Sequence, residues 1–229
     1  MAYHPIENYG IIGNMRTAAL VGMHGSIDWL CFPHFDSPSI FAAILDDHKG
    51  GHFRIVAVNH GTRTKQFYWP DTNILVTRFL SADGVAEMHD FMPAGMGTGS
   101  GWHNQIIRRI RVVRGKVTFR LECYPAFDYA RARHETTLTT NGAVFESATQ
   151  SLALATALPL KADDRGVFGE FTLGIGEPAV CALRPIERHA HPDPPPSEDT
   201  TQELFEHTVR FWRGWLSQCT YAGRWREMV

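Results

Sequence analysis

The spacing of apolar residues changes once along this chain. From residue 17 to about residue 185, short segments alternate apolar and polar side chains, and Gly, Pro, Asn or Asp separates one segment from the next. This pattern is typical of antiparallel strands that bury one face. So many strands in succession predict an all-β fold, a large antiparallel two-sheet sandwich.

The clearest strands are predicted over residues 104–114 and 116–124, and Gly115 between them predicts a tight hairpin turn. Asn141 and Gly142 predict a second hairpin, because both residues tolerate a positive φ. Further strands are predicted over residues 52–58, 64–69, 74–81, 85–91, 136–140, 143–147, 151–155, 168–174 and 179–183.

Beyond residue 188 the pattern is different. Residues 189–200 are polar and rich in proline, which predicts a stiff linker. Thr200 and Glu203 form a capping-box pattern that predicts the start of a helix. Residues that are apolar apart from Thr208 then recur at helical spacing, namely Leu204, Phe205, Thr208, Phe211, Trp212, Trp215, Leu216 and Cys219. We therefore expect a sandwich domain over residues 1–188, the linker, and a helical part over residues 201–229.

Composition and charge exclude several partners. The net charge of −2 gives no basic surface, so a nucleic-acid partner is not expected. No apolar stretch approaches the length of a membrane span, and the amino terminus does not resemble a signal peptide. The four cysteines lie far apart without a Cys-x-x-Cys pair, which predicts reduced thiols and a cytoplasmic protein.

Neither a metal nor a cofactor is expected. His189 and His191 could share a metal, but no further ligand at a suitable spacing completes the set. The glycine-rich segment 93–101 lacks the spacing and the lysine of a phosphate-binding loop, so it predicts a surface loop.

The stretch over residues 25–39 carries the most suggestive chemistry. A predicted strand leads into a loop between two prolines, and this stretch sets Asp28 and Asp36 beside Trp29 and Phe35. Carboxylates beside rings suit a sugar, whose hydroxyls need acceptors and whose C–H faces need apolar contact. The alternative is that Trp29 belongs to the core, Asp28 is solvated and Asp36 caps the turn.

This stretch and several others together resemble the amino-terminal part of glycoside hydrolase family 15, which includes glucoamylases, glucodextranases and trehalase-like enzymes. The residues that carry the resemblance are 5–14, 18–22, 25–39, 50–51, 71–79, 90–93, 114–117 and 125–129. One departure is His34, where the family more often has arginine.

The resemblance implies a non-catalytic domain of an inverting α-glucoside hydrolase, either glucoamylase-like or trehalase-like. In that family the acid and base carboxylates come from an (α/α) barrel that follows this domain, so no catalytic residue is assigned here. The domain packs on that barrel, and the loop over residues 25–39 is expected to reach the rim of its substrate pocket. The chain is then expected to stop at the domain junction, within the first helix of the barrel.

Two alternatives remain open. A stand-alone carbohydrate-binding or interaction module needs no hydrolase partner, but it predicts a polar final helix rather than one rich in tryptophan. An epimerase-like enzyme would need a His and a Glu in a concave sheet, and Glu87 and His89 lie on one predicted strand face, whereas Glu87 and Asp90 lie on opposite faces. If nothing covers the aromatic face of the last helix, the chain is expected to self-associate.

Overall fold

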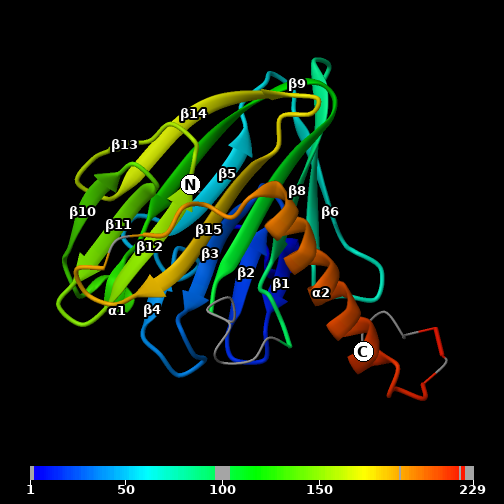
Figure 1. The fold of residues 1–229 in the computed structure, drawn as a ribbon, viewed down its shortest axis with the longest axis horizontal. Coiled ribbons are helices and arrows are strands. Elements are labelled where there is room, and N and C mark those ends of the chain that lie inside the picture. The colour runs from blue at the N-terminus through cyan, green and yellow to red at the C-terminus, as the bar shows by residue number, and fades with distance from the viewer. Residues whose placement is uncertain (1–2, 96–103, 191, 222, 225–229) are drawn as a thin grey trace.

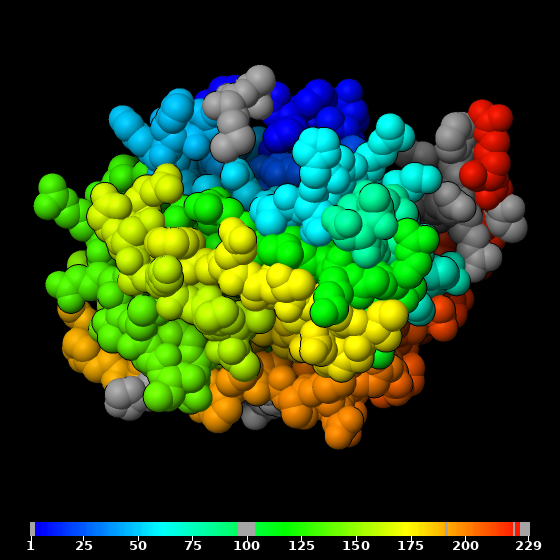
Figure 2. Space-filling model, turned by 90° about the horizontal axis from the view of Figure 1, so that it is seen from above, coloured from blue at the N-terminus to red at the C-terminus, as the bar shows by residue number. Residues whose placement is uncertain are grey.

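The computed structural model describes residues 3–95, 104–190, 192–221 and 223–224. Its strands pair antiparallel and form two packed layers, with one long helix, α2 (Glu198–Leu216), outside them (Figure 1). Seen from above, the first strands in blue and α2 in orange lie on opposite sides of the molecule (Figure 2). The predicted all-β sandwich is therefore confirmed.

The two layers, called sheet 1 and sheet 2 below, share the 19-residue strand β9 (Ile106–Tyr124). Sheet 1 also contains β1 (Tyr9–Gly13), β2 (Ala18–Gly22), β3 (Ser26–Cys31), β4 (Ser39–Phe41), β5 (His52–Ala57), β13 (Lys161–Ala162) and β14 (Val167–Gly174). Sheet 2 also contains β6 (Arg63–Tyr68), β7 (Leu75–Leu80), β8 (Gly84–Phe91), β10 (His134–Thr139), β11 (Gly142–Ser147), β12 (Ser151–Thr156) and β15 (Ala179–Ile186). Two short helical turns complete the fold, η1 (Ile6–Asn8) and α1 (Phe127–Ala130).

The hairpin predicted at Gly115 is wrong, because β9 continues through this residue. Its first half pairs with β8 and β15 in sheet 2, and its second half pairs with β5 and β14 in sheet 1. Gly115 has a φ of 67°, and a Cβ there would lie 2.0 Å from the backbone oxygen of Asp83. The glycine therefore allows a bend at the crossing between the layers. The second predicted hairpin is confirmed, since Thr139 pairs with Gly142.

The core lies between the two sheets and is built from inward-facing aliphatic and aromatic side chains. Phe79 of sheet 2 packs edge-to-face on Phe119 of sheet 1, with ring centroids 5.5 Å apart. Phe53 and Ile27, which pair across β5 and β3, are fully buried. Their neighbours in sequence therefore project from the outer face of sheet 1, because side chains alternate along a strand.

Helix α2 packs on the outer face of sheet 2. Ser197 caps its first turn, with its hydroxyl accepting a hydrogen bond from the Thr200 backbone amide at 3.1 Å. The predicted start at the Thr200 capping box is thus three residues late, because Ser197 is the first residue after the prolines that can cap. Leu204, Phe205 and Val209 pack on Ile74, Phe91, Ile107, Ala155 and Ala182.

Two features bear on the sequence predictions. The four cysteines are free, and Cys31, Cys123 and Cys181 are buried. Within the described part of the chain, no helix combines the length and the apolar character that a bilayer crossing requires.

Candidate functional site

The four residues predicted to bind sugar do not form one cluster. Asp28 and Trp29 are neighbours on β3 at a register shift, where Ile27 pairs with Val21 but Trp29 pairs with Leu20 of β2. Phe35 and Asp36 lie on the loop after β3, where Phe35 is 61% exposed and Asp36 is also exposed. Among the described residues, no hydrogen bond joins Asp28 to Asp36.

Asp28 is buried on the outer face of sheet 1, so the alternative in which it is solvated is wrong. Its carboxylate accepts hydrogen bonds from the Tyr9 hydroxyl at 2.9 Å and from the Ser26 hydroxyl at 2.5 Å. Burial, reinforced by the charge of Asp28, raises the pKa of Tyr9 well above its ordinary value. Nearby, burial lowers the pKa of His24 to about 4, against the opposing charge of Asp28.

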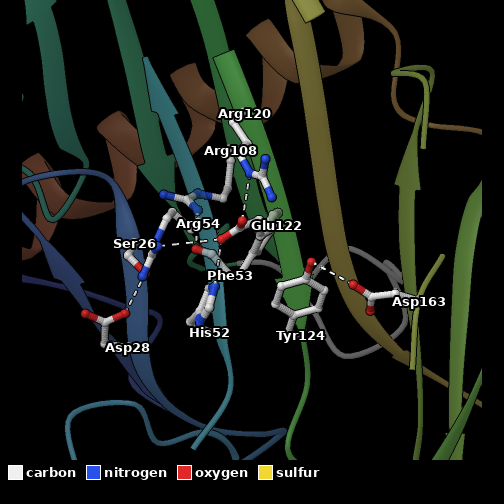
Figure 3. A network of polar contacts seen from close by, with 10 residues as sticks. All are labelled: Ser26, Asp28, His52, Phe53, Arg54, Arg108, Arg120, Glu122, Tyr124 and Asp163. Carbon is white, nitrogen blue, oxygen red and sulfur yellow. Dashed lines mark hydrogen bonds and ion pairs between the residues drawn. The ribbon is translucent and has the colours of Figure 1, made fainter. Parts of the chain in front are cut away.

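Glu122 is the centre of a second polar cluster on the same face, shown in Figure 3. Its carboxylate lies 3.1 Å from His52 Nε2, 2.8 Å from Arg120 Nε and 3.6 Å from Arg54 Nη1. The hydrogen bond with His52, followed by that with Arg120 and the charge of Arg54, lowers the pKa of Glu122 to about 2, although burial opposes the shift. The register of β3 and β5 places Ser26 opposite Arg54, so the two clusters adjoin.

The polar row continues to the far side of β9. The Tyr124 hydroxyl donates to Asp163 at 3.1 Å, and the Arg165 guanidinium lies 4.3 Å from the centre of the Tyr124 ring. Burial, followed by the bond to Asp163, raises the pKa of Tyr124 to about 12. We call this set the outer polar row: Tyr9, Ser26, Asp28, His52, Arg54, Arg120, Glu122, Tyr124 and Asp163.

The outer polar row is suited to recognition rather than to proton transfer. Its carboxylates are held by phenol, hydroxyl, imidazole or guanidinium donors, and the lowered pKa of Glu122 keeps that carboxyl group ionised. A general acid in glycoside hydrolysis needs the opposite shift. Sequence reasoning found only Asp28 in this row, because the other contacts depend on which strands lie side by side.

Trp29 contacts a residue that the sequence analysis did not single out. The Tyr129 ring lies 6.5 Å from the Trp29 ring, at an interplanar angle of 49°. Tyr129 belongs to α1, where Asp128, Tyr129 and Ala130 all have a left-handed backbone, with φ of 52°, 55° and 63°. Each such residue costs about 1–2 kcal/mol relative to the right-handed form. Nothing in the sequence Phe-Asp-Tyr-Ala indicates this conformation.

Comparison with known proteins decides the family. Residues 1–158 match the family model described as trehalase-like, N-terminal. The chain belongs to the trehalase-like N-terminal domain family. This membership confirms the resemblance drawn from the sequence.

The relatives of this trehalase-like domain are named trehalases. The trehalase of Thermoplasma volcanium is 30% identical over 230 residues, covering 99% of this chain and 36% of that protein. The trehalase of Thermoplasma acidophilum is 33% identical over 213 residues, covering 92% of this chain and 36% of that protein. The trehalase of Mycobacterium tuberculosis is 28% identical over 237 residues, covering 94% of this chain and 34% of that protein. The chain thus spans about a third of the length of these relatives.

In this trehalase-like domain, Glu87 and His89 do not form an open site on the face of sheet 2 that carries α2. His89 Nε2 lies 3.5 Å from Glu87, but Trp69 and Phe205 pack on the imidazole, with ring centroids 5.8 and 5.5 Å away. The neighbouring His89 imidazole, followed by the hydrogen bond from Arg78, lowers the pKa of Glu87 to about 2, although burial opposes the shift. Asp90 is buried in the core with Arg108, on the face of β8 opposite to Glu87, as the predicted opposite faces of these two residues require. The epimerase-like alternative therefore lacks the concave site that it requires.

The loop after β3 borders a hollow of about 380 Å³ at one end of the trehalase-like domain. The Gln150 amide donates to the Phe32 backbone oxygen at 2.7 Å and so ties the loop to the turn between β11 and β12. His34, the departure from family 15, is exposed, and its backbone amide donates to the Ser37 hydroxyl at 3.1 Å. Side chains around the hollow include Pro33, Pro38, Thr149 and Arg188.

The predicted absence of a metal rests on the sequence alone. Within the described ranges, no group of three or more His, Cys, Asp or Glu side chains could hold a metal ion. His189 lies 3.6 Å from the Glu146 carboxylate, whereas His191 lies outside the described residues.

Proposed function

We propose that this chain is a non-catalytic amino-terminal domain of a trehalase-like inverting hydrolase and that it packs on a catalytic barrel. The family match over residues 1–158 carries the proposal, because the relatives that share this domain are named trehalases and are about three times as long. The remaining two thirds of such a protein have room for the barrel. Free buried thiols support a cytoplasmic location, where thiols stay reduced.

The chemistry of the described carboxylates supports a non-catalytic role. Inverting hydrolysis needs a protonated acid and a carboxylate base roughly 6.5–9.5 Å apart, with the pKa of the acid raised. Here Glu87 and Glu122 have lowered pKa values, and Asp90 is ion-paired in the core. The acid and the base are therefore assigned to the barrel.

We assign an α-glucoside, trehalose first, as the substrate of the complete enzyme. The loop after β3 supplies rim residues, with exposed Phe35 as an apolar wall and exposed Asp36 as an acceptor for sugar hydroxyls. Trp29 contributes ring surface from β3. Asp28 is satisfied by Tyr9 and Ser26, so its role is to fix the start of the loop.

The second half of α2 is the surface proposed to meet the barrel. Its first half is buried on sheet 2 through Leu204, Phe205 and Val209. Further along, Trp215 is 45% exposed and packs edge-to-face on Trp212. An exposed tryptophan at the end of a helix that is otherwise packed on its own domain is suited to a contact with a further domain.

A chimeric enzyme tests the proposal. This chain would replace the matched amino-terminal part of the Thermoplasma acidophilum trehalase, and the same trehalase lacking that part would be the control. We expect the chimera to release glucose from trehalose and the truncated protein to release much less. A folded chimera no more active than the truncated protein would contradict the proposal and favour a stand-alone carbohydrate-binding module.

A further inference from the structure

The turn α1 is the most strained backbone in the described part of the chain. Six described non-glycine residues have positive φ, and only in α1 do three of them follow one another. Consecutive left-handed residues persist only where their surroundings fix them, and such strain gathers at ligand sites. The supports here are a hydrogen bond from the Ala132 amide to the Phe127 backbone oxygen at 3.1 Å and the burial of Phe127.

The result of the turn is the position of Tyr129. The ring remains 44% exposed while it contacts Trp29 and lies close to the Cys31 thiol. Trp29 and Tyr129 come from segments a hundred residues apart, and both segments are among those that carry the family resemblance. The strained turn thus completes an aromatic pair at the edge of the strand that leads into the rim loop.

Charged groups flank this pair on the exposed side. The Arg131 guanidinium lies 5.5 Å from the centre of the Tyr129 ring and donates to the Asp128 carboxylate at 2.7 Å. Both side chains are accessible, with 69% and 37% of their surfaces exposed. Ring surface beside an accessible donor and acceptor matches a pyranose, which presents an apolar C–H face and a rim of hydroxyls.

We propose that Trp29 and Tyr129 form a binding subsite for a glucosyl unit, with Asp128 and Arg131 as partners for its hydroxyls. The choice of a glucoside rests on the proposed function, whereas the subsite itself requires no barrel. A protein partner is less well matched, because the pair is bordered by charged, accessible groups rather than by a continuous apolar surface.

Nuclear magnetic resonance of the chain labelled with ¹⁵N tests the subsite. The six tryptophans give separate indole signals, and Trp29→Phe assigns that of Trp29. On titration with trehalose, we expect the Trp29 signal to move with a Kd in the millimolar range, on the order of 1–10 mM. Sorbitol, an acyclic polyol without a flat C–H face, should move it far less.

Variants separate binding from folding. Tyr129→Ala should weaken trehalose binding about fivefold through loss of a ring contact. Tyr129→Phe, which keeps the ring, should retain binding. Tyr221→Ala, which removes another ring exposed to a similar extent, should not change it. Circular dichroism would establish that each variant is folded.

Three results would overturn the subsite: no movement of the Trp29 signal up to the solubility limit of trehalose, equal movement with sorbitol, or unchanged binding in folded Tyr129→Ala. If the Trp29 signal moved only on addition of a trehalase barrel, and not with sugar, this result would also overturn the subsite and would identify α1 as a contact with the barrel. An active chimera whose isolated amino-terminal chain shows no sugar-dependent shift would contradict the subsite alone. Sugar binding by the chain with an inactive chimera would contradict the proposed function alone.

Discussion

Asp90 accepts two hydrogen bonds from Arg108 inside the sandwich, at 2.8 and 3.1 Å, where neither side chain has any exposed surface. Both residues belong to sheet 2. The same guanidinium donates to the backbone oxygens of Phe53 and Gly25, at 2.6 and 2.7 Å, on the side of sheet 1. Arg108 therefore connects the two layers; Figure 3 draws Arg108 beside Phe53, whose backbone oxygen accepts one of these hydrogen bonds.

The first prediction concerns this buried pair. Asp90→Ala leaves the Arg108 charge buried without its counter-ion, which should lower the free energy of unfolding by about 3–5 kcal/mol. Arg210→Ala, which removes an exposed partner 3.9 Å from Glu206, should change it by no more than about 0.5 kcal/mol. Urea unfolding measures both. Equal effects of the two substitutions would show that Arg108 does not hold the layers together.

The second prediction is a dependence of stability on pH. The pKa of Glu122 is about 2 in the folded chain against an ordinary 4.5. A lowered folded pKa means that its stabilising contribution is complete above pH 4.5 and is lost as the pH falls towards 2. Glu122→Gln should therefore lose less stability than the unmodified chain over that window.

His52→Ala provides the matched control for Glu122. It keeps the carboxylate but removes the partner that contributes most to its lowered pKa, so the folded pKa of Glu122 should lie nearer 4.5. The loss of stability below pH 4.5 should then be smaller and should be complete at a higher pH than in the unmodified chain. Thermal unfolding followed from pH 6 to the acid limit of folding measures all three proteins. If the melting temperatures of the unmodified chain, Glu122→Gln and His52→Ala fell in parallel with pH, the role given to Glu122 would be contradicted.

The third prediction tests the packing of α2. Phe205 is 7% exposed and packs on Trp69, His89 and Phe91, so Phe205→Ala should lower the free energy of unfolding by about 3 kcal/mol. Trp215→Ala, on the exposed half of the same helix, should lower it by no more than about 1 kcal/mol. If Phe205→Ala had no effect in urea unfolding, α2 would not be part of the folded sandwich.

The limits of the sequence predictions have physical reasons. Alternation along a strand is local, so strands such as β8 and β14 were predicted within a residue of their ends. A glycine with positive φ is equally compatible with a hairpin turn and with a bend inside one strand. Only the pairing of β9 with its neighbouring strands shows that Gly115 lies at a bend. The cluster around Glu122 depends on the register of β5 against β9 and could not be predicted from spacing. Asp28 was found, but its partner Tyr9 lies in β1, which precedes the region of predicted strands.

The fourth prediction concerns the strain in α1. Glycine adopts a φ near 63° without the steric cost that alanine pays, so Ala130→Gly should stabilise the chain or leave it unchanged. Glycine is also more flexible than alanine in the unfolded chain, which opposes this stabilisation. The net increase in the free energy of unfolding should therefore be about 0–1 kcal/mol. Thermal unfolding measures it, with Ala143→Gly in a buried strand as a destabilising control. A clear loss of stability in Ala130→Gly would show that this turn is not strained.

Glucose release by the purified chain tests the central claim most directly. The chain would be incubated with trehalose, and separately with maltose, and free glucose would be measured by a coupled enzymatic assay. A non-catalytic domain should release no glucose above the rate without protein. Glucose release that Glu87→Gln or Glu122→Gln abolishes in a folded protein would place the catalytic carboxylate within this chain and would contradict the account.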